Sequence, residues 1–213
     1  SYLVLMAWVR PPGAGKRLKA TAAGIAAIAI FWSAQFIDSW LDSLTSSIIR
    51  DWLPARLAAE LPGLREPGMV AIGSGTTDPY QPVEAEARIV GHCAELLADA
   101  GMPVAVMTKS DLVLRDLDTW RRVNERSLFV LLISITTLRE DARAACEPGA
   151  SPVKARLEAM RTFKKAGCAV GALAMPFLPG ITDDESGIRE LYAELAAVGV
   201  DFVMPGGLSL RPG

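Results

Sequence analysis

Polar side chains lie at or just after the ends of three short apolar runs of the sequence, at 69–72, 104–107 and 129–135. The polar positions that we single out are Thr76, Thr77, Asp78, Lys109, Ser134 and Thr136. A lysine ammonium binds a carboxylate or phosphate as a compact point charge, and hydroxyls exchange hydrogen bonds with amine, carboxylate or ribose groups. Together these residue types predict a site for a small zwitterionic ligand.

Each of these residues also has a purely structural interpretation. Asp78 precedes a proline, which is ordinary turn chemistry. Lys109 is close in sequence to Asp111 and Asp116, so a surface ion pair is open to it. Arg115, Asp116 and Asp118 fit an ion-pair network with a helix cap. The repetition of such residues at successive strand ends favours a binding site over these separate roles.

The chain lacks the residue patterns of hydrolytic and zinc chemistry. Its three cysteines, Cys93, Cys146 and Cys168, are widely spaced, and no CxxC or HExxH pattern occurs. No serine or cysteine nucleophile has a histidine base at a recognisable spacing. We predict no protein-bound metal from these residues and expect all three cysteines to be buried as small apolar side chains.

Apolar strand patterns alternate with helical patterns from residue 48 onward. We expect strands at 69–72, 104–107, 129–135, 169–175 and 201–204. We expect helices at 48–61, 83–100, 117–125, 151–166 and 183–197, with Ser151 as the N-cap of the fourth. This alternation is typical of an α/β protein with parallel strands, either an open doubly wound sheet or a barrel. In both, ligands bind at the carboxyl ends of the strands.

The first part of the chain has a different composition. Residues 20–37 carry no charge and follow three basic residues, so they are at the lower limit of length for a membrane span. Alanine, threonine, serine and glutamine dilute this run, and we expect a buried element there rather than a span. We therefore divide the chain into an unassigned apolar segment, 1–44, and one α/β domain, 45–213. The formal net charge of −2 gives no general basic field for nucleic acid.

Several motifs resemble those of the spore photoproduct lyase-like family of radical SAM proteins. Residues 73–84 are similar to its TDPYQPxE loop, and residues 108–118 to its TKS and LRDxD signature. SITTL at 134–138, EPGASP at 147–152 and the proline turn at 176–180 match further elements in the same order. The resemblance covers about two-thirds of the chain, from residue 66 to 213.

The resemblance implies a partial (β/α)6 TIM-like barrel, incomplete at its N-terminal side, and a cytoplasmic radical enzyme of the lyase-like type. Its cofactors would be S-adenosylmethionine and a [4Fe–4S] cluster. By similarity, Lys109 and Ser134 would hold the methionyl carboxylate. Thr76, Thr77, Asp78 and Thr136 would also line the cofactor, with Tyr80 and Arg115 toward the substrate.

Two departures from the family pattern alter that expectation. The CxxxCxxC motif that holds the cluster is absent, and Gly75 stands where the lyases carry a hydrogen-donating cysteine. We therefore do not expect thymine-dimer repair, and we expect this chain to lack radical activity, with residues 1–44 the product of a frameshift or of decay. Two alternatives remain: a non-catalytic barrel that binds S-adenosylmethionine or a nucleoside, and a membrane-anchored interaction protein. The substrate is not indicated.

Overall fold

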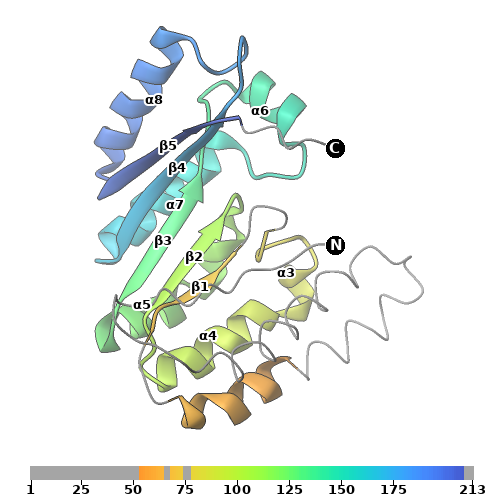
Figure 1. Ribbon diagram of the computed structural model, residues 1–213, viewed down its shortest axis with the longest axis vertical. Helices are drawn as coiled ribbons and strands as arrows, with labels where there is room; N and C mark the ends of the chain where they lie inside the picture. Colours follow the sequence, from red (N-terminus) through yellow and green to blue (C-terminus); the bar gives the residue numbers. More distant parts are fainter. Residues whose placement is uncertain (1–52, 65–67, 74–77, 209–213) are drawn as a thin grey trace, which may run out of the picture. The chain divides into compact units, whose positions relative to one another are not determined.

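The computed structural model describes residues 53–64, 68–73 and 78–208 (Figure 1). The predicted segment 1–44, Thr76 and Thr77 lie outside the described residues. Within them, no helix is long and apolar enough to cross a membrane.

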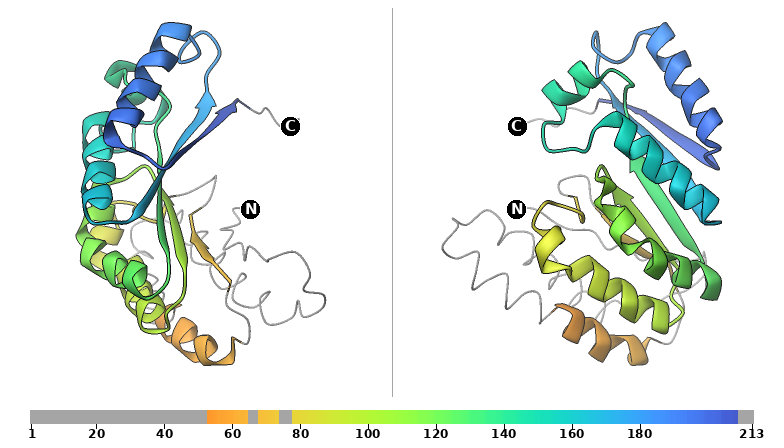
Figure 2. Two further views of the ribbon diagram at one scale, coloured as in Figure 1. Left: turned by 90° about the vertical axis from the view of Figure 1, so that its left-hand side faces the viewer. Right: turned by 180° about the vertical axis from the view of Figure 1, so that it is seen from behind.

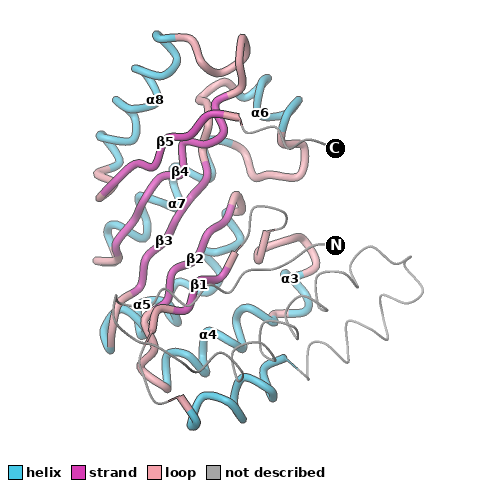
Figure 3. The backbone as a smooth tube through the Cα atoms, viewed as in Figure 1, coloured by secondary structure: helices cyan, strands magenta, loops and turns pink. Residues whose placement is uncertain are grey.

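Five strands form one sheet in the order of the chain: β1 (Val70–Ile72), β2 (Val104–Thr108), β3 (Phe129–Ser134), β4 (Ala169–Phe177) and β5 (Phe202–Gly207). The pairs β1–β2, β3–β4 and β4–β5 are parallel. The strand order contains no reversal, whereas a doubly wound sheet reverses at its switch point. The observed order is that of a barrel wall, as the resemblance implied, and all five predicted strands are confirmed (Figure 3).

The described residues belong to two compact units. Unit 1 contains residues 53–106 together with Asp118–Phe129. It includes a helix over 53–60, a 3-10 turn η2 (Leu61–Gly63), α3 (Glu84–Ala87), α4 (Ile89–Asp99) and most of α5 (Leu117–Arg126). Trp120 and Phe129 are fully buried, and their rings stack with centroids 4.8 Å apart.

The prediction of one continuous helix over 83–100 is wrong, because the helix is interrupted at Arg88. Arg88 has a left-handed backbone with φ of 52°, and it separates α3 from α4. The buried Glu84 carboxylate accepts hydrogen bonds from the backbone N–H groups of Ile89 and Val90, each at 3.0 Å. Glu84 therefore caps α4 from a separate helical turn, satisfying donors that a helix N-terminus leaves unpaired.

Unit 2 contains Met107–Leu117 and residues 130–208. It includes a 3-10 helix η3 (Asp111–Asp116), α6 (Glu140–Cys146), α7 (Val153–Lys165) and α8 (Glu185–Val198). Figure 2 shows α7 and α8 on the same side of strands β3 to β5. The interior of this unit is built from alternate residues of β3, Leu131 and Ile133, and from Met160 and Phe163 of α7, all fully buried.

The two predicted helix starts in unit 2 have different outcomes. The start predicted for the helix over 183–197 is confirmed to within two residues, because α8 begins at Glu185 and the carboxylate of its N-cap residue, Asp184, accepts the backbone N–H of Gly187 at 2.8 Å. Ser151 does not cap α7, so that prediction is wrong: the N-cap residue is Pro152, and no side chain of its own caps the helix. Instead, Glu140 Oε2 accepts the N–H of Val153 at 3.0 Å, and the Ser151 hydroxyl is used elsewhere.

Candidate functional site

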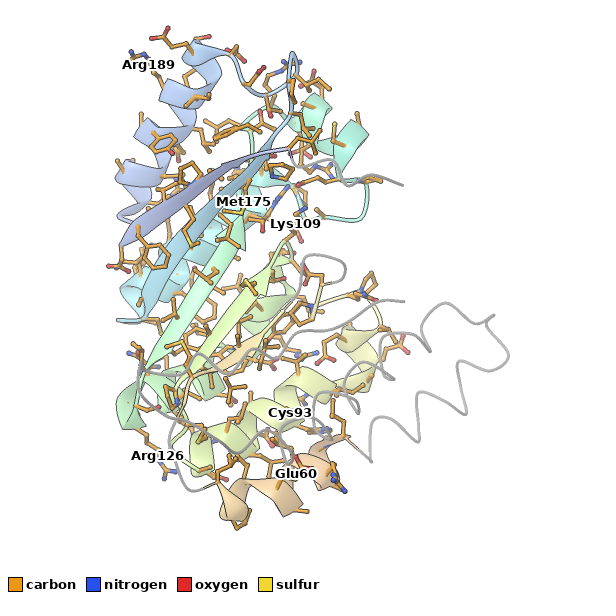
Figure 4. The ribbon with its side chains drawn as sticks, in the orientation of Figure 1. Glu60, Cys93, Lys109, Arg126, Met175 and Arg189 are labelled. Carbon is orange, nitrogen blue, oxygen red and sulfur yellow. The ribbon has the colours of Figure 1, made fainter. Side chains whose placement is uncertain are left out.

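Lys109 follows the last residue of β2, at the carboxyl end of that strand (Figure 4). Its ammonium nitrogen lies 2.8 Å from Oε1 of Glu147, in the loop between α6 and α7. The Lys109 side chain is 38% exposed, whereas that of Glu147 is 11% exposed. The cation thus presents part of its surface to solvent while it is held by a largely buried carboxylate.

Arg156 of α7 lies on the other side of Glu147 and is almost completely buried, at 1% exposure. Its Nη2 is 3.0 Å from Glu147 Oε2, an ion-pair distance whose direction does not satisfy hydrogen-bond geometry. Burial lowers the pKa of Arg156 from its ordinary value, and the negative charge of Glu147 opposes that shift. Since an arginine side chain stays protonated in proteins, Glu147 is the counter-ion that makes this burial tolerable.

Arg156 also connects the site to β3. Its Nη1 donates to the backbone oxygen of Ser134 at 2.7 Å, and its Nε donates to the backbone oxygen of Ser151 at 2.9 Å. A chain of contacts therefore runs from Lys109 through Glu147 and Arg156 to Ser134. It links the carboxyl ends of β2 and β3, where the sequence predicted a site.

The loop at 147–152 is fastened to the segment that follows β2. The N–H of Ser151 donates to the backbone oxygen of Lys109 at 3.1 Å. The Ser151 hydroxyl donates to Asp111 Oδ1 at 2.6 Å and accepts from the Asp111 N–H at 3.0 Å. These contacts explain why Ser151 cannot serve as an N-cap, and they fix the loop beside Lys109.

Arg143 of α6 holds the same loop from within. Its Nη1 donates to the backbone oxygens of Glu147 and Ala150, at 3.2 and 3.0 Å. Its own charge is balanced by Glu140, whose Oε1 accepts from Nε at 2.7 Å. The loop that carries Glu147 is therefore held at both ends by buried or half-buried arginines.

The structure places the other predicted site residues as follows. Ser134 ends β3, and Thr136, two residues later, is buried at 8% exposure. Asp78 forms a turn in which its Oδ1 accepts the N–H of Tyr80 at 2.9 Å. Lys109, Ser134 and Thr136 belong to unit 2, whereas Asp78 and Tyr80 belong to unit 1.

The two residues predicted on the substrate side have internal partners. Tyr80 is 2% exposed, and its hydroxyl accepts from the indole N–H of Trp120 at 2.9 Å. Arg115 makes two hydrogen bonds to the buried carboxylate of Asp116, at 2.9 and 2.7 Å. The structural interpretation of the Arg115–Asp116 pair is therefore confirmed.

Glu147 and Arg156 are the site residues that the sequence analysis did not assign. Glu147 is the first residue of the EPGASP motif at 147–152, and the sequence analysis predicted no binding role for it. Arg156 belongs to the buried face of α7, between Val153 and Leu157. A charged residue on the apolar face of a helix is rarely buried unless it is paired. The position of Arg156 in the sequence therefore indicates that it has an acidic partner.

The three cysteines differ in their exposure to solvent. The expectation that all three are buried is wrong, because Cys146, at the end of α6, is exposed. Cys93 and Cys168 are buried, and burial, with a smaller effect of Glu84, raises the pKa of the Cys93 thiol to about 12. No group of three or more potential ligand side chains that could hold a metal ion occurs in the described part of the chain, which includes all three cysteines.

A family model described as the radical SAM superfamily matches residues 54–204. The chain belongs to the radical SAM superfamily. An uncharacterised protein of Acidianus two-tailed virus, ORF301, is 34% identical over 147 residues, which are 67% of this chain and 47% of that protein. An uncharacterised protein of Mycobacterium tuberculosis is 29% identical over 142 residues, covering 67% of this chain and 42% of the relative. The chain thus spans less than half the length of these relatives.

Solved structures of radical SAM enzymes share the fold. SuiB of Streptococcus suis matches with a TM-score of 0.55 and 12% identity, over 79% of this chain and 34% of SuiB. Spore photoproduct lyase complexed with dinucleoside spore photoproduct matches with a TM-score of 0.51 and 22% identity, over 71% of this chain and 43% of the lyase. These matches confirm the predicted barrel-type fold.

Proposed function

We propose that this chain binds S-adenosylmethionine at the carboxyl ends of β2 and β3. The observation that supports this most is the line of contacts from Lys109 through Glu147 and Arg156 to Ser134. It ties the partly exposed ammonium to the strand end that carries the Ser134 hydroxyl, and both belong to unit 2. An ammonium and a hydroxyl are a suitable donor set for one carboxylate, which is the group that the methionyl end of the ligand presents.

Each residue has a defined part in this proposal. The Lys109 ammonium forms an ion pair with the ligand carboxylate, and the Ser134 hydroxyl donates a hydrogen bond to it. Thr136 is assigned to the same ligand from the segment after β3. The assignment of Thr76, Thr77 and Asp78 to the cofactor stays a prediction from the family resemblance. The assignment of Tyr80 and Arg115 to the substrate side stays a prediction from the family resemblance.

We further propose that this chain alone does not cleave the sulfonium reductively. In the superfamily that step takes an electron from a [4Fe–4S] cluster, and the three cysteines described above do not supply its thiolates. Anaerobic incubation with iron and sulfide, followed by iron counting and absorption spectroscopy, tests this. Incorporation of four irons per chain with a cluster spectrum would overturn it.

Calorimetric titration with S-adenosylmethionine tests the binding proposal. Lys109→Ala should weaken binding by about tenfold or more, the value of a charge-assisted hydrogen bond. Lys164→Ala is the matched control, because Lys164 is another unit 2 lysine whose ammonium pairs with Asp201, at 2.7 Å. It should leave the affinity unchanged. Equal affinity of the wild-type protein and Lys109→Ala would refute the site.

A further inference from the structure

Glu147 is shared between an exposed cation and a buried one. Oε1 faces the Lys109 ammonium at 2.8 Å, and Oε2 faces the Arg156 guanidinium at 3.0 Å. We propose that Glu147 is a positioning residue, which holds the Lys109 ammonium in place for the ligand carboxylate. This inference rests on the proposed function. It gives a role to Glu147, which is not among the residues proposed to contact the ligand.

Lysine needs such a support more than most residues. Its ammonium is carried on four methylene groups, and ordering that stem when a ligand arrives reduces affinity. A cation that is already held in its binding position avoids that loss. Because the Lys109 side chain is 38% exposed, packing alone does not fix it, and the Glu147 carboxylate provides an anchor.

The anchor is itself rigid. Glu147 is 11% exposed, and its second oxygen is held by Arg156, which is fixed by the backbone oxygens of Ser134 and Ser151. Arg143 holds the backbone oxygen of Glu147, and Ser151 returns to the backbone oxygen of Lys109. Both ends of the Lys109–Glu147 pair are therefore attached to the same loop. If Glu147 served only to neutralise Arg156, the hydrogen bond from Ser151 that fastens its loop to Lys109 would not be needed.

A double-mutant cycle on the affinity for S-adenosylmethionine separates positioning from general structural support. Glu147→Gln should weaken binding by about five- to tenfold, because the Lys109 side chain loses its charged anchor and must then be ordered when the ligand binds. In a Lys109→Ala background the same substitution should change the affinity by less than about threefold, because the residue that Glu147 positions is gone. Glu147→Asp, which keeps a negative charge beside Arg156, should show the same dependence on Lys109 if Glu147→Gln does not fold.

Glu185→Gln is the matched control. Glu185 is another ion-paired carboxylate of unit 2, but its partner is Arg189 of the same helix, α8. Glu185→Gln should leave the affinity unchanged with and without Lys109. Thermal unfolding of every variant establishes that the folded protein is titrated.

The outcomes distinguish this inference from the proposed function. Loss of the Glu147 effect in the Lys109→Ala background supports positioning. Equal effects in both backgrounds, or wild-type affinity of Glu147→Gln, would overturn it while the binding site stands. If wild-type protein does not bind S-adenosylmethionine at all, the proposed function and this inference both fail.

Discussion

Replacement of Glu84 by glutamine should destabilise the protein by removing the cap of α4. The Glu84 carboxylate is 3% exposed and accepts the N–H groups of Ile89, Val90 and Gly91 at 3.0, 3.0 and 3.4 Å. Glutamine has one oxygen in place of two, so at least one buried N–H then faces an amide donor. An unsatisfied buried group costs about 1–3 kcal/mol, and loss of a charge at a helix N-terminus costs about 0.3–1 kcal/mol.

The expected loss in the free energy of unfolding is therefore about 1.3–4 kcal/mol. For a chain of this size each kcal/mol lowers Tm by about 2–4 °C, which gives a decrease of roughly 3–16 °C. Urea unfolding of wild-type protein, Glu84→Gln and Glu86→Gln measures it. Glu86 is an exposed carboxylate of the same short helix α3, and its substitution should stay within about 0.5 kcal/mol.

Hydrogen exchange locates the effect. Protection of the Ile89 and Val90 amides should fall in Glu84→Gln by more than the global loss of stability explains. If Glu84→Gln and Glu86→Gln unfold at the same urea concentration, Glu84 does not hold the start of α4 as argued here.

Further predictions concern the reactivity of the cysteines and the stability of the fold at acidic pH. In the folded protein, N-ethylmaleimide at pH 8 should modify Cys146 alone, because Cys93 and Cys168 are buried and the pKa of Cys93 is raised to about 12; two or more adducts by mass spectrometry before unfolding would contradict this. Hydrogen bonds from Lys164 and from the N–H of Val170 lower the pKa of Asp201, so its stabilising effect is present above the unfolded value of about 3.9 and is lost as the pH falls through the folded value. Asp201→Asn should therefore lower the urea midpoint at pH 7, and its difference from wild type should shrink as the pH falls below about 3.9. A difference that stays constant as the pH falls would refute the linkage.

The strand ends could be predicted from the sequence because parallel strands have a simple local signature. Apolar runs such as 104–107 and 129–135 identify buried strands, and the polar residues at or just after the end of each run are then placed at the binding edge. Lys109 and Ser134 were found in this way. Their positions depend on the chain immediately around them.

What the sequence did not disclose depends on distant partners or on unusual backbone. Arg88 adopts a left-handed conformation that is uncommon outside glycine, and the apolar periodicity continues through it. Ser151 follows the N-cap preference but bonds Asp111, forty residues earlier in the chain. Glu147 and Arg156 gain their roles only when the loop after α6 returns to β2. Such pairings are set by tertiary structure, which local propensity does not encode.

The most direct test of the central claim compares S-adenosylmethionine with its decarboxylated analogue by calorimetry. If Lys109 binds the carboxylate, wild-type protein should bind the analogue about tenfold or more weakly. In Lys109→Ala the difference in affinity between the two ligands should become much smaller, since only the Ser134 hydroxyl then distinguishes them. Equal affinity of wild-type protein for both ligands, or a preference for the carboxylate that is undiminished in Lys109→Ala, would contradict the assignment of Lys109 as the carboxylate site.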